Sequence, residues 1–299
     1  MKQEHCYIQN SLSCMEGVKT IPLFAGIELA YLSLTGGDSF SIQHKEAFHI
    51  MAINYCKSGR IGWKMESGNY VYLGAGDFSV HMMNLCANSE INLPNENYEG
   101  ISIYIDLQEF TSNPPNLLLG TEITGTTLYE KLCKNDTLIS VAGNEQTDAI
   151  FRFFFNQPQN VQLPYQKIKV LELLVYLYNA EKLSNQCVTE YQAEQIELIR
   201  QIHEQLLNRL EKRITIEELS KQYLMNPTTM KALFKSVYGT SIAAHMKEHR
   251  MRKAAKMLLE SDMSIGEIAF SVGYDNQSKF STAFKDFFQM LPKEYRKKR

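Results

Sequence analysis

The chain has 299 residues, enough for two or three domains and a sizeable core. Hydrophobic residues make up 44% and charged residues 21%, as in an ordinary soluble globular protein, and 15 Phe and 16 Tyr argue against disorder. No apolar stretch is long enough for a membrane span, and the polar N-terminus fits no signal peptide, so we expect a cytoplasmic protein. The six cysteines include no CxxC pair, which favours reduced thiols over a disulfide framework or a zinc site.

The net charge of −2 hides an asymmetry along the chain. Residues 200–299 carry 19 Lys and Arg against 11 Asp and Glu, whereas residues 1–199 carry 12 against 22. A basic region can neutralise phosphates, and counterion release then supplies affinity for nucleic acid. The same side chains could instead only solvate helix faces, so charge alone leaves both interpretations open.

Short strands are predicted from Gly26 to Asp106 by apolar runs between turn signals. The predicted strands are 26–34, 48–55, 61–65, 70–73, 78–83 and 98–106, with turns at 57–60, 67–69 and 74–77. Strands at this spacing indicate a small barrel or sandwich. Their order, with a turn just before Asp77, resembles the cupin-type barrels of bacterial sensor proteins.

The barrel is expected to be a sensor and not an enzyme. A cupin enzyme would bind a metal, usually through an HxH motif and a downstream Glu, and His44, His49 and His81 form no HxH. We therefore expect no catalytic residues, no metal and no cofactor. A barrel of this size can hold one small ligand. The candidates for its lining, most of which could equally be core residues, are Tyr55, Trp63, Tyr72, His81 and Tyr104.

The middle of the chain is predicted to be helical, with helices at 144–155 and 165–182. The second helix carries an apolar stripe at helical spacing, which includes Ile168, Leu171 and Leu174. This stripe either packs on the barrel or forms a dimer contact, because the apolar face is wider than one partner needs. Residues 183–190 form the expected linker.

A helix-turn-helix pattern begins at Thr215, which can form a capping box with Glu218. After a turn at 224–226, Asn226 caps a second helix, 227–238, which Gly239 ends. The apolar residues of that helix face the core. The side chains expected on its outer face, and therefore on DNA, are Thr228, Lys231 and Lys235.

The pattern recurs about 50 residues later. Ser264 caps a helix that ends at Ser271, and Asp275 or Asn276 caps the next helix, which runs to Phe288. The residues expected to point inward are Phe280, Ala283, Phe284 and Phe287. The residues expected on DNA are Ser278, Lys279, Thr282 and Lys285, the last as a phosphate contact.

A long helix over 241–260 is predicted between the two patterns, and its 20 residues span roughly 30 Å. Recognition helices that enter successive major grooves on one face of DNA lie about 34 Å apart. One chain can therefore present both recognition helices to a single DNA face, with their N-terminal side chains at base edges.

The residues of this region resemble the DNA-binding domain of AraC/XylS-type bacterial transcription regulators over roughly 195–299. The matching residues are Leu219, Leu233, Phe234, Lys235, Gly239, Arg250, Met251, Ala254, Leu258, Leu259, Ile265, Ile268, Ala269, Val272, Gly273, Tyr274, Phe280, Phe284, Lys285, Pro292, Tyr295 and Arg296. The resemblance implies an all-helical domain that binds double-stranded DNA as an activator or repressor, with RNA polymerase as a candidate partner. It also implies an N-terminal domain that senses a small-molecule effector or forms a homodimer. Ala232, Gln289 and Leu291 depart from the family pattern and leave the operator sequence unreadable.

The predicted fold class is a multidomain protein with a mainly-β cupin-like barrel plus helices, followed by an all-α double helix-turn-helix domain. The predicted domains are a ligand-sensing domain at 1–143, a helical dimerisation or linker region at 144–190, and the DNA-binding domain at 191–299. Two alternatives remain: a regulator controlled by a protein partner, and a cupin-type enzyme fused to a DNA-binding domain. The chain has no GxSxG, phosphate-loop, HExxH or GxGxxG motif, which disfavours the enzyme.

Overall fold

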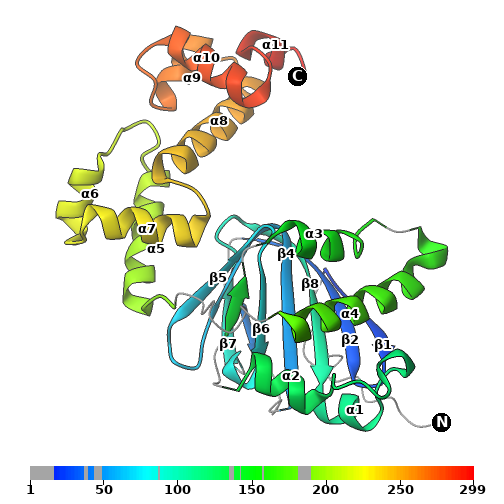
Figure 1. Cartoon of the computed structure of the whole chain (residues 1–299). Helices are drawn as coiled ribbons and strands as arrows, with labels where there is room; N and C mark the ends of the chain where they lie inside the picture. Colours follow the sequence, from blue (N-terminus) through cyan, green and yellow to red (C-terminus); the bar gives the residue numbers. More distant parts are fainter. Residues whose placement is uncertain are drawn as a thin grey trace. The chain divides into compact units, whose positions relative to one another are not determined.

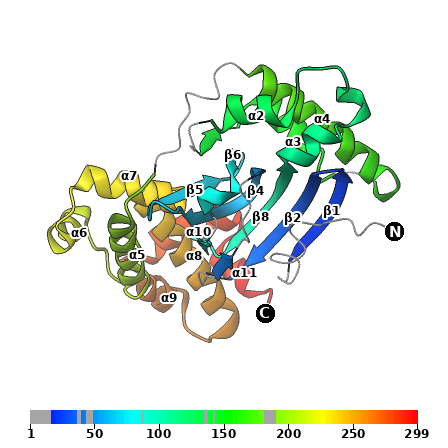
Figure 2. The same cartoon turned by 90° about the horizontal axis from the view of Figure 1, so that it is seen from below.

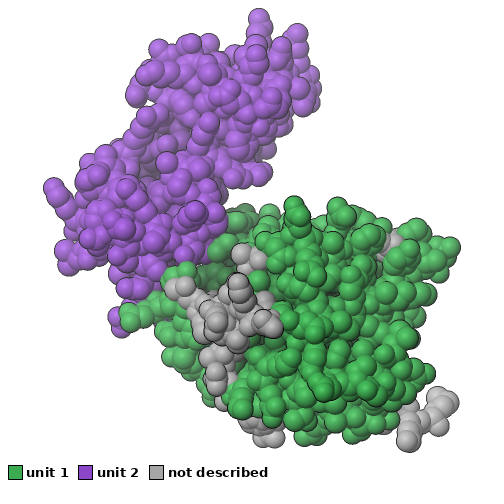
Figure 3. All heavy atoms as spheres, in the orientation of Figure 1, with its two compact units in different colours: residues 1–192 green, residues 193–299 purple. Residues whose placement is uncertain are grey.

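The computed structural model describes residues 17–36, 40–43, 49–86, 88–134, 138–141, 143–156, 158–180 and 190–299. The chain divides into two compact units, an N-terminal unit over 1–192 and a C-terminal unit over 193–299 (Figure 3). Antiparallel strands and a few helices build the N-terminal unit, and helices alone build the described C-terminal unit, which confirms the predicted fold class (Figure 1). Among the described residues, no helix combines the length and the apolar character that crossing a bilayer requires.

The strands of the N-terminal unit pair in the order β1-β2-β8-β4-β6-β9, while β5 and β7 pair with β4, and β3 pairs with β7. Their bounds are β1 Val18–Phe24, β2 Ile27–Thr35, β3 Phe40–Gln43, β4 Ile50–Lys64, β5 Tyr70–Gly74, β6 Phe78–Met82, β7 Asn88–Asn92, β8 Asn97–Asp106 and β9 Ile139–Val141. Strands β1, β3, β7 and β9 lie outside the predicted ranges.

Strand β4 is the centre of this sheet, and the turn predicted at 57–60 is wrong. The strand continues through that segment, with its first half on β6 and β8 and its second half on β5 and β7. The polar residues and Gly59 (φ 77°) mark a β-bulge instead, where the pairing with β8 shifts register between Cys56 and Ser58.

The two faces of the strands contribute to two different apolar cores. Helices α1 Leu107–Ser112, α2 Gly125–Leu132, α3 Glu145–Arg152 and α4 Gln162–Asn179 accompany the sheet, and Figure 2 shows α2, α3 and α4 on one side of it. The helix-side core contains Ile101, Ile103 and Ile105 of β8. The inner core contains Tyr98 and Tyr104 of the same strand. This alternation follows from the two-residue period of a strand.

Part of the apolar stripe of α4 packs on the sheet, and part of it is exposed. Leu171 and Leu174 are buried in the helix-side core, so this part of the stripe packs on the sheet. Ile168 and Val175 remain 57% and 41% exposed. The predicted linker, 183–190, lies outside the described residues except for Glu190. Glu190 accepts hydrogen bonds from Ser67 and Asn69.

The described part of the C-terminal unit consists of seven helices around apolar cores. Their bounds are α5 Ala193–Leu207, α6 Ile216–Tyr223, α7 Pro227–Tyr238, α8 Ile242–Glu260, α9 Ile265–Ser271, α10 Gln277–Phe288 and α11 Pro292–Arg296. Helices α7 and α10 each contain 12 residues and start 50 residues apart, so the predicted recurrence is also a structural one.

Candidate nucleic-acid interface

Helices α6 and α7 form the first helix-turn-helix unit, and polar side chains fix both of their starts. The Thr215 backbone N–H donates to Glu218 at 2.7 Å, and the Glu218 N–H donates to the Thr215 hydroxyl at 3.2 Å. This is the predicted capping box. Asn226 accepts from the Thr228 N–H at 2.8 Å, and Pro227 occupies the first helical position. These local bonds define where the recognition helix α7 begins.

Helices α9 and α10 form the second unit with the same devices. The Ser264 backbone N–H donates to Glu267 at 2.7 Å, and the Glu267 N–H returns a bond to the Ser264 hydroxyl at 3.2 Å. Asn276, one of the two predicted caps, accepts from the Ser278 N–H at 2.7 Å. The recognition helix of each unit therefore starts at an Asn cap.

One predicted core position of α10 is wrong. Phe287 is 36% exposed, whereas Phe288 lies with its ring centroid 4.6 Å from that of Phe284 and 5.1 Å from that of Tyr295. Helix α11 supplies Tyr295 on the Phe288 side, and this tertiary contact decides which of the two rings is covered.

Helix α8 separates the two units, with α6 and α7 near one end and α9 and α10 near the other (Figure 1). Its 19 residues span about 28 Å. Residues 210–213, here called the strap, contact the middle of α8 and the turn of the second unit. The Arg250 guanidinium of α8 donates to the carbonyls of Leu210 and Lys212, each at 2.9 Å. Arg213 lies over the Tyr274 ring at 5.8 Å, next to the second turn.

All seven residues predicted to contact DNA are exposed: Thr228, Lys231, Lys235, Ser278, Lys279, Thr282 and Lys285. Within the part of the chain that the structure describes, none of the four lysines in this set forms an ion pair with a carboxylate. Their charges are therefore not neutralised inside the unit, and they remain available to phosphates.

The helix starts differ in charge between the recognition helices and their partners. Helices α6 and α9 carry glutamates in their first turns, whereas the first turns of α7 and α10 carry no acidic residue. The backbone N–H groups and dipole at a helix N-terminus attract anions. No acidic side chain in the first turn of α7 or α10 therefore opposes the attraction of these helix ends for DNA phosphates.

Two further exposed residues lie at the same helix ends and were not among the predicted contacts. Thr229 follows Thr228 in α7, and Gln277 is the first residue of α10. Gln is suited to a bidentate contact with adenine. The position of each in the first helical turn after the Asn cap is the sequence signal that would have identified them.

The five residues predicted to line a ligand site are all buried, but they do not converge. Trp63 and Tyr104 belong to the inner core, and the His81 ring lies 6.0 Å from Trp63. Tyr55 belongs to the helix-side core and stacks on Phe151 at 4.2 Å. Tyr72 has Tyr70 and Tyr191 as its ring neighbours, both at 6.4 Å. Three of the five therefore share one region.

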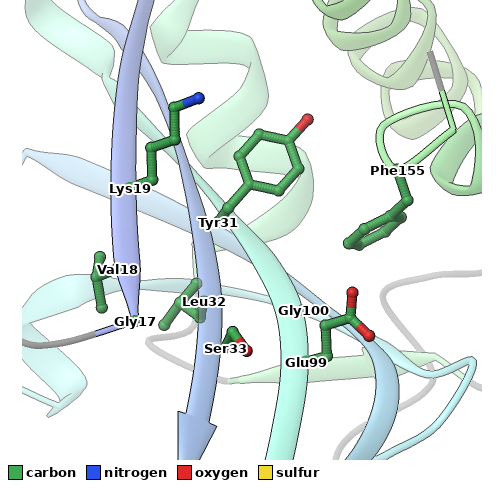
Figure 4. Close-up of a pocket in the computed structure, with 9 residues that line it drawn as sticks. All are labelled: Gly17, Val18, Lys19, Tyr31, Leu32, Ser33, Glu99, Gly100 and Phe155. Carbon is green, nitrogen blue, oxygen red and sulfur yellow. The ribbon is translucent and has the colours of Figure 1, made fainter. Parts of the chain in front are cut away.

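A pocket of about 350 Å³ opens elsewhere in the N-terminal unit and contains none of those five residues. Lys19 of β1, Tyr31 of β2, Glu99 of β8 and Phe155 surround it (Figure 4). The Tyr31 hydroxyl donates to the Phe154 carbonyl at 2.6 Å and accepts from Gln166 at 2.8 Å. Burial raises the pKa of Tyr31, so its hydroxyl stays protonated.

The Cys56 thiol is not in a reactive form. Cys56 and Cys133 are buried and form no disulfide. Burial, with the Asp77 charge nearby, raises the pKa of Cys56 to about 12. At neutral pH this thiol is protonated, and the thiolate is the reactive form.

Comparison with known proteins identifies the C-terminal unit. The family model described as "Helix-turn-helix domain" matches residues 219–298. The transcriptional regulator AlkR of Acinetobacter baylyi is 38% identical over 86 residues, 29% of this chain and 28% of that protein. ExsA of Pseudomonas aeruginosa is 40% identical over 81 residues, 27% of this chain and 29% of that protein. The match thus spans less than a third of these curated relatives.

A solved structure of ToxT from Vibrio cholerae, with an unsaturated fatty acid bound, aligns with 90% of this chain and 94% of its own, at 14% identity and a TM-score of 0.37. The matched family model runs from within α6 to the end of α11 and so includes both recognition helices. Residues 219–298 therefore belong to the AraC-type helix-turn-helix domain family.

Proposed function

We propose that this protein is a sequence-specific DNA-binding transcription regulator whose N-terminal unit controls the DNA-binding unit. It acts as an activator, with RNA polymerase as its partner, or as a repressor. The observation that carries the proposal is the pair of recognition helices, each with an exposed polar face and a first turn free of acidic residues. Side chains at those positions fit base edges and phosphates.

Selection from a random DNA library would identify the preferred site, and binding to that site and to a scrambled site would then be measured at several salt concentrations. We expect the full chain and residues 191–299 to prefer the selected site, with affinity that falls steeply with salt. A folded chain that selects no sequence, or that binds selected and scrambled DNA equally, would contradict the proposal.

The effector proposal concerns the inner core of the N-terminal unit. The Trp63 indole N–H is buried and has no hydrogen-bond partner among the described residues, and His81 and Tyr104 lie in the same region. An unpaired buried donor favours an acceptor group on a small molecule. Native mass spectrometry of protein purified from cells tests this: a bound small molecule that Trp63→Phe releases supports it, and a co-purifying protein with no small molecule contradicts it.

The exposed side of α4 is proposed as a homodimer contact. Ile168 and Val175 lie one heptad apart and are exposed, whereas Leu171 is buried in the core. Sedimentation should show a dimer that Ile168→Glu dissociates. Leu117→Glu, at a residue 78% exposed outside α4, is the matched control and should leave the dimer intact. A wild-type monomer at the concentrations that bind DNA would rule this contact out.

A further inference from the structure

Three histidines of the C-terminal unit, none of them among the residues predicted to contact DNA, converge at one point. His203 comes from α5, and His245 and His249 come from successive turns of α8. The Nε2 atom of His245 lies 2.9 Å from that of His203 and 3.1 Å from that of His249. One ligand nitrogen from each of the three rings lies within 4.8 Å of the other two.

A metal ion explains this arrangement better than hydrogen bonds alone. The Nε2 atom of His245 faces two other Nε2 atoms, and a neutral ring carries a proton or a lone pair there, not both. A tetrahedral Zn²⁺ with bonds of about 2.0–2.1 Å separates its ligand nitrogens by about 3.3 Å. The two short separations are close to that value, so small side-chain shifts would place all three lone pairs on one ion.

Aromatic side chains enclose the three histidines, which therefore do not form an ordinary surface cluster. The Tyr238 ring lies 4.2 Å from the His203 ring and 4.9 Å from the His245 ring, and Phe234 covers the same rings. These aromatic walls come from α7, so three helices enclose the cluster. Burial and the neighbouring imidazoles lower the pKa of His203 to about 3 and that of His245 to about 4. Neutral imidazole is the form that binds metals.

We propose that His203, His245 and His249 bind one divalent transition-metal ion of the zinc type. Imidazole nitrogens suit zinc, nickel, copper and cobalt, whereas magnesium and calcium prefer oxygen ligands. The pair on α8 has the i, i+4 spacing that places both rings on one helix face. His203 and His249 are half-buried, so water can complete the coordination. The ion would join α5 to α8 beside the last turn of the first recognition helix.

Full-length protein without a histidine tag, stripped with a chelator, would be titrated with Zn²⁺ and, separately, with Co²⁺. We expect one Zn²⁺ per chain and, with Co²⁺, the strong visible absorption of a tetrahedral nitrogen site. At Zn²⁺ concentrations about a hundred times Kd, the thermal midpoint of the helical unit should rise by about 10 °C or more.

His203→Gln and His249→Gln should each remove the tightly bound Zn²⁺ and the Co²⁺ bands. The matched control is His49→Gln in the N-terminal unit, where His49 lies 3.4 Å from Asp106, and it should change neither. The two variants concern half-buried residues, and their circular dichroism without metal shows that they fold. The proposal is overturned if the wild-type chain takes up no stoichiometric Zn²⁺, or if both folded cluster variants bind it as the wild type does.

Discussion

The two helix-turn-helix units share a plan but place glycine differently. At the turn, the first unit has Leu224 in the left-handed conformation at φ 50°, and the second has Gly273 at φ 80°. At the end of the recognition helix the order reverses, with Gly239 at φ 79° and Gln289 at φ 55°. Leu224 is 94% exposed, whereas a Cβ on Gly273 would lie 2.7 Å from the Leu210 carbonyl oxygen. Contact with the neighbouring backbone, and not the motif itself, makes glycine necessary at one of the two turns.

Gly273→Ala should have the largest effect on stability. The new Cβ would clash with the Leu210 and Glu211 carbonyl oxygens, and alanine also disfavours the left-handed backbone. We therefore expect the free energy of unfolding to fall by about 3 kcal/mol. Gly239→Ala places a side chain on the same left-handed backbone at the end of α7, and we expect a loss of about 1 kcal/mol. Denaturant unfolding of the two variants compares them. Equal losses would show that the strap contact contributes nothing.

Lysines near the start and near the end of the recognition helices should differ in how they contribute to DNA binding. Lys231→Ala in the first unit and Lys279→Ala in the second should each cost about 1–3 kcal/mol on the selected site and relax base preference. Lys285→Ala should weaken all sequences alike and lower the salt slope by about one. Lys256→Ala, an exposed lysine of α8 that pairs with Glu260 at 4.0 Å, is the control for loss of charge. Equal losses on selected and random DNA for Lys231 and Lys279 would exclude base readout.

Glycine at the two remaining left-handed positions should stabilise the protein. Leu224→Gly and Gln289→Gly each remove the steric cost of a side chain on a left-handed backbone. We expect the free energy of unfolding to rise by about 1 kcal/mol in each variant, measured with denaturant. Leu224→Ala keeps the backbone cost and serves as the control. Gln289 also donates to the Asp286 carbonyl at 2.9 Å, and losing this bond reduces its gain. A loss of stability in Leu224→Gly would mean that the exposed side chain has a partner elsewhere.

The smallest effect is expected at the start of α11. Leu291 precedes Pro292 and offers no side-chain cap, although its backbone N–H donates to Glu294 at 2.9 Å. In α8 the equivalent cap is Ser241, which accepts from the Ala244 N–H at 3.3 Å. Leu291→Ser should add about 0.5–1 kcal/mol, and Ser241→Ala should remove a similar amount, in the same unfolding assay. No gain from Leu291→Ser would indicate that the leucine side chain already compensates through packing.

Features set by neighbouring residues could be predicted from the sequence. The capping boxes at Thr215 and Ser264 and the Asn caps of both recognition helices depend on residues within three positions of one another, and all are present. The exposed sides of α7 and α10 follow from the 3.6-residue period in the same way.

Features set by distant residues could not be predicted. Tyr55 and Trp63 are eight residues apart on one strand and should share a face, but the bulge between Cys56 and Ser58 sends them to opposite cores. His203 and His245 are 42 residues apart and meet only because α5 packs against α8. Neither the opposite placement of Tyr55 and Trp63 nor the contact between His203 and His245 can be predicted from neighbouring residues in the sequence.

The strap has a consequence for how strongly the protein can hold DNA. Because α8 joins the two units and residues 210–213 contact both Arg250 and Tyr274, the two recognition helices are held together before DNA arrives. Once one helix binds, the other is already presented at a high effective concentration, and its binding has no separate translational cost. Two individually weak half-sites would then be bound with an avidity that neither reaches alone, provided that their spacing matches the length of α8.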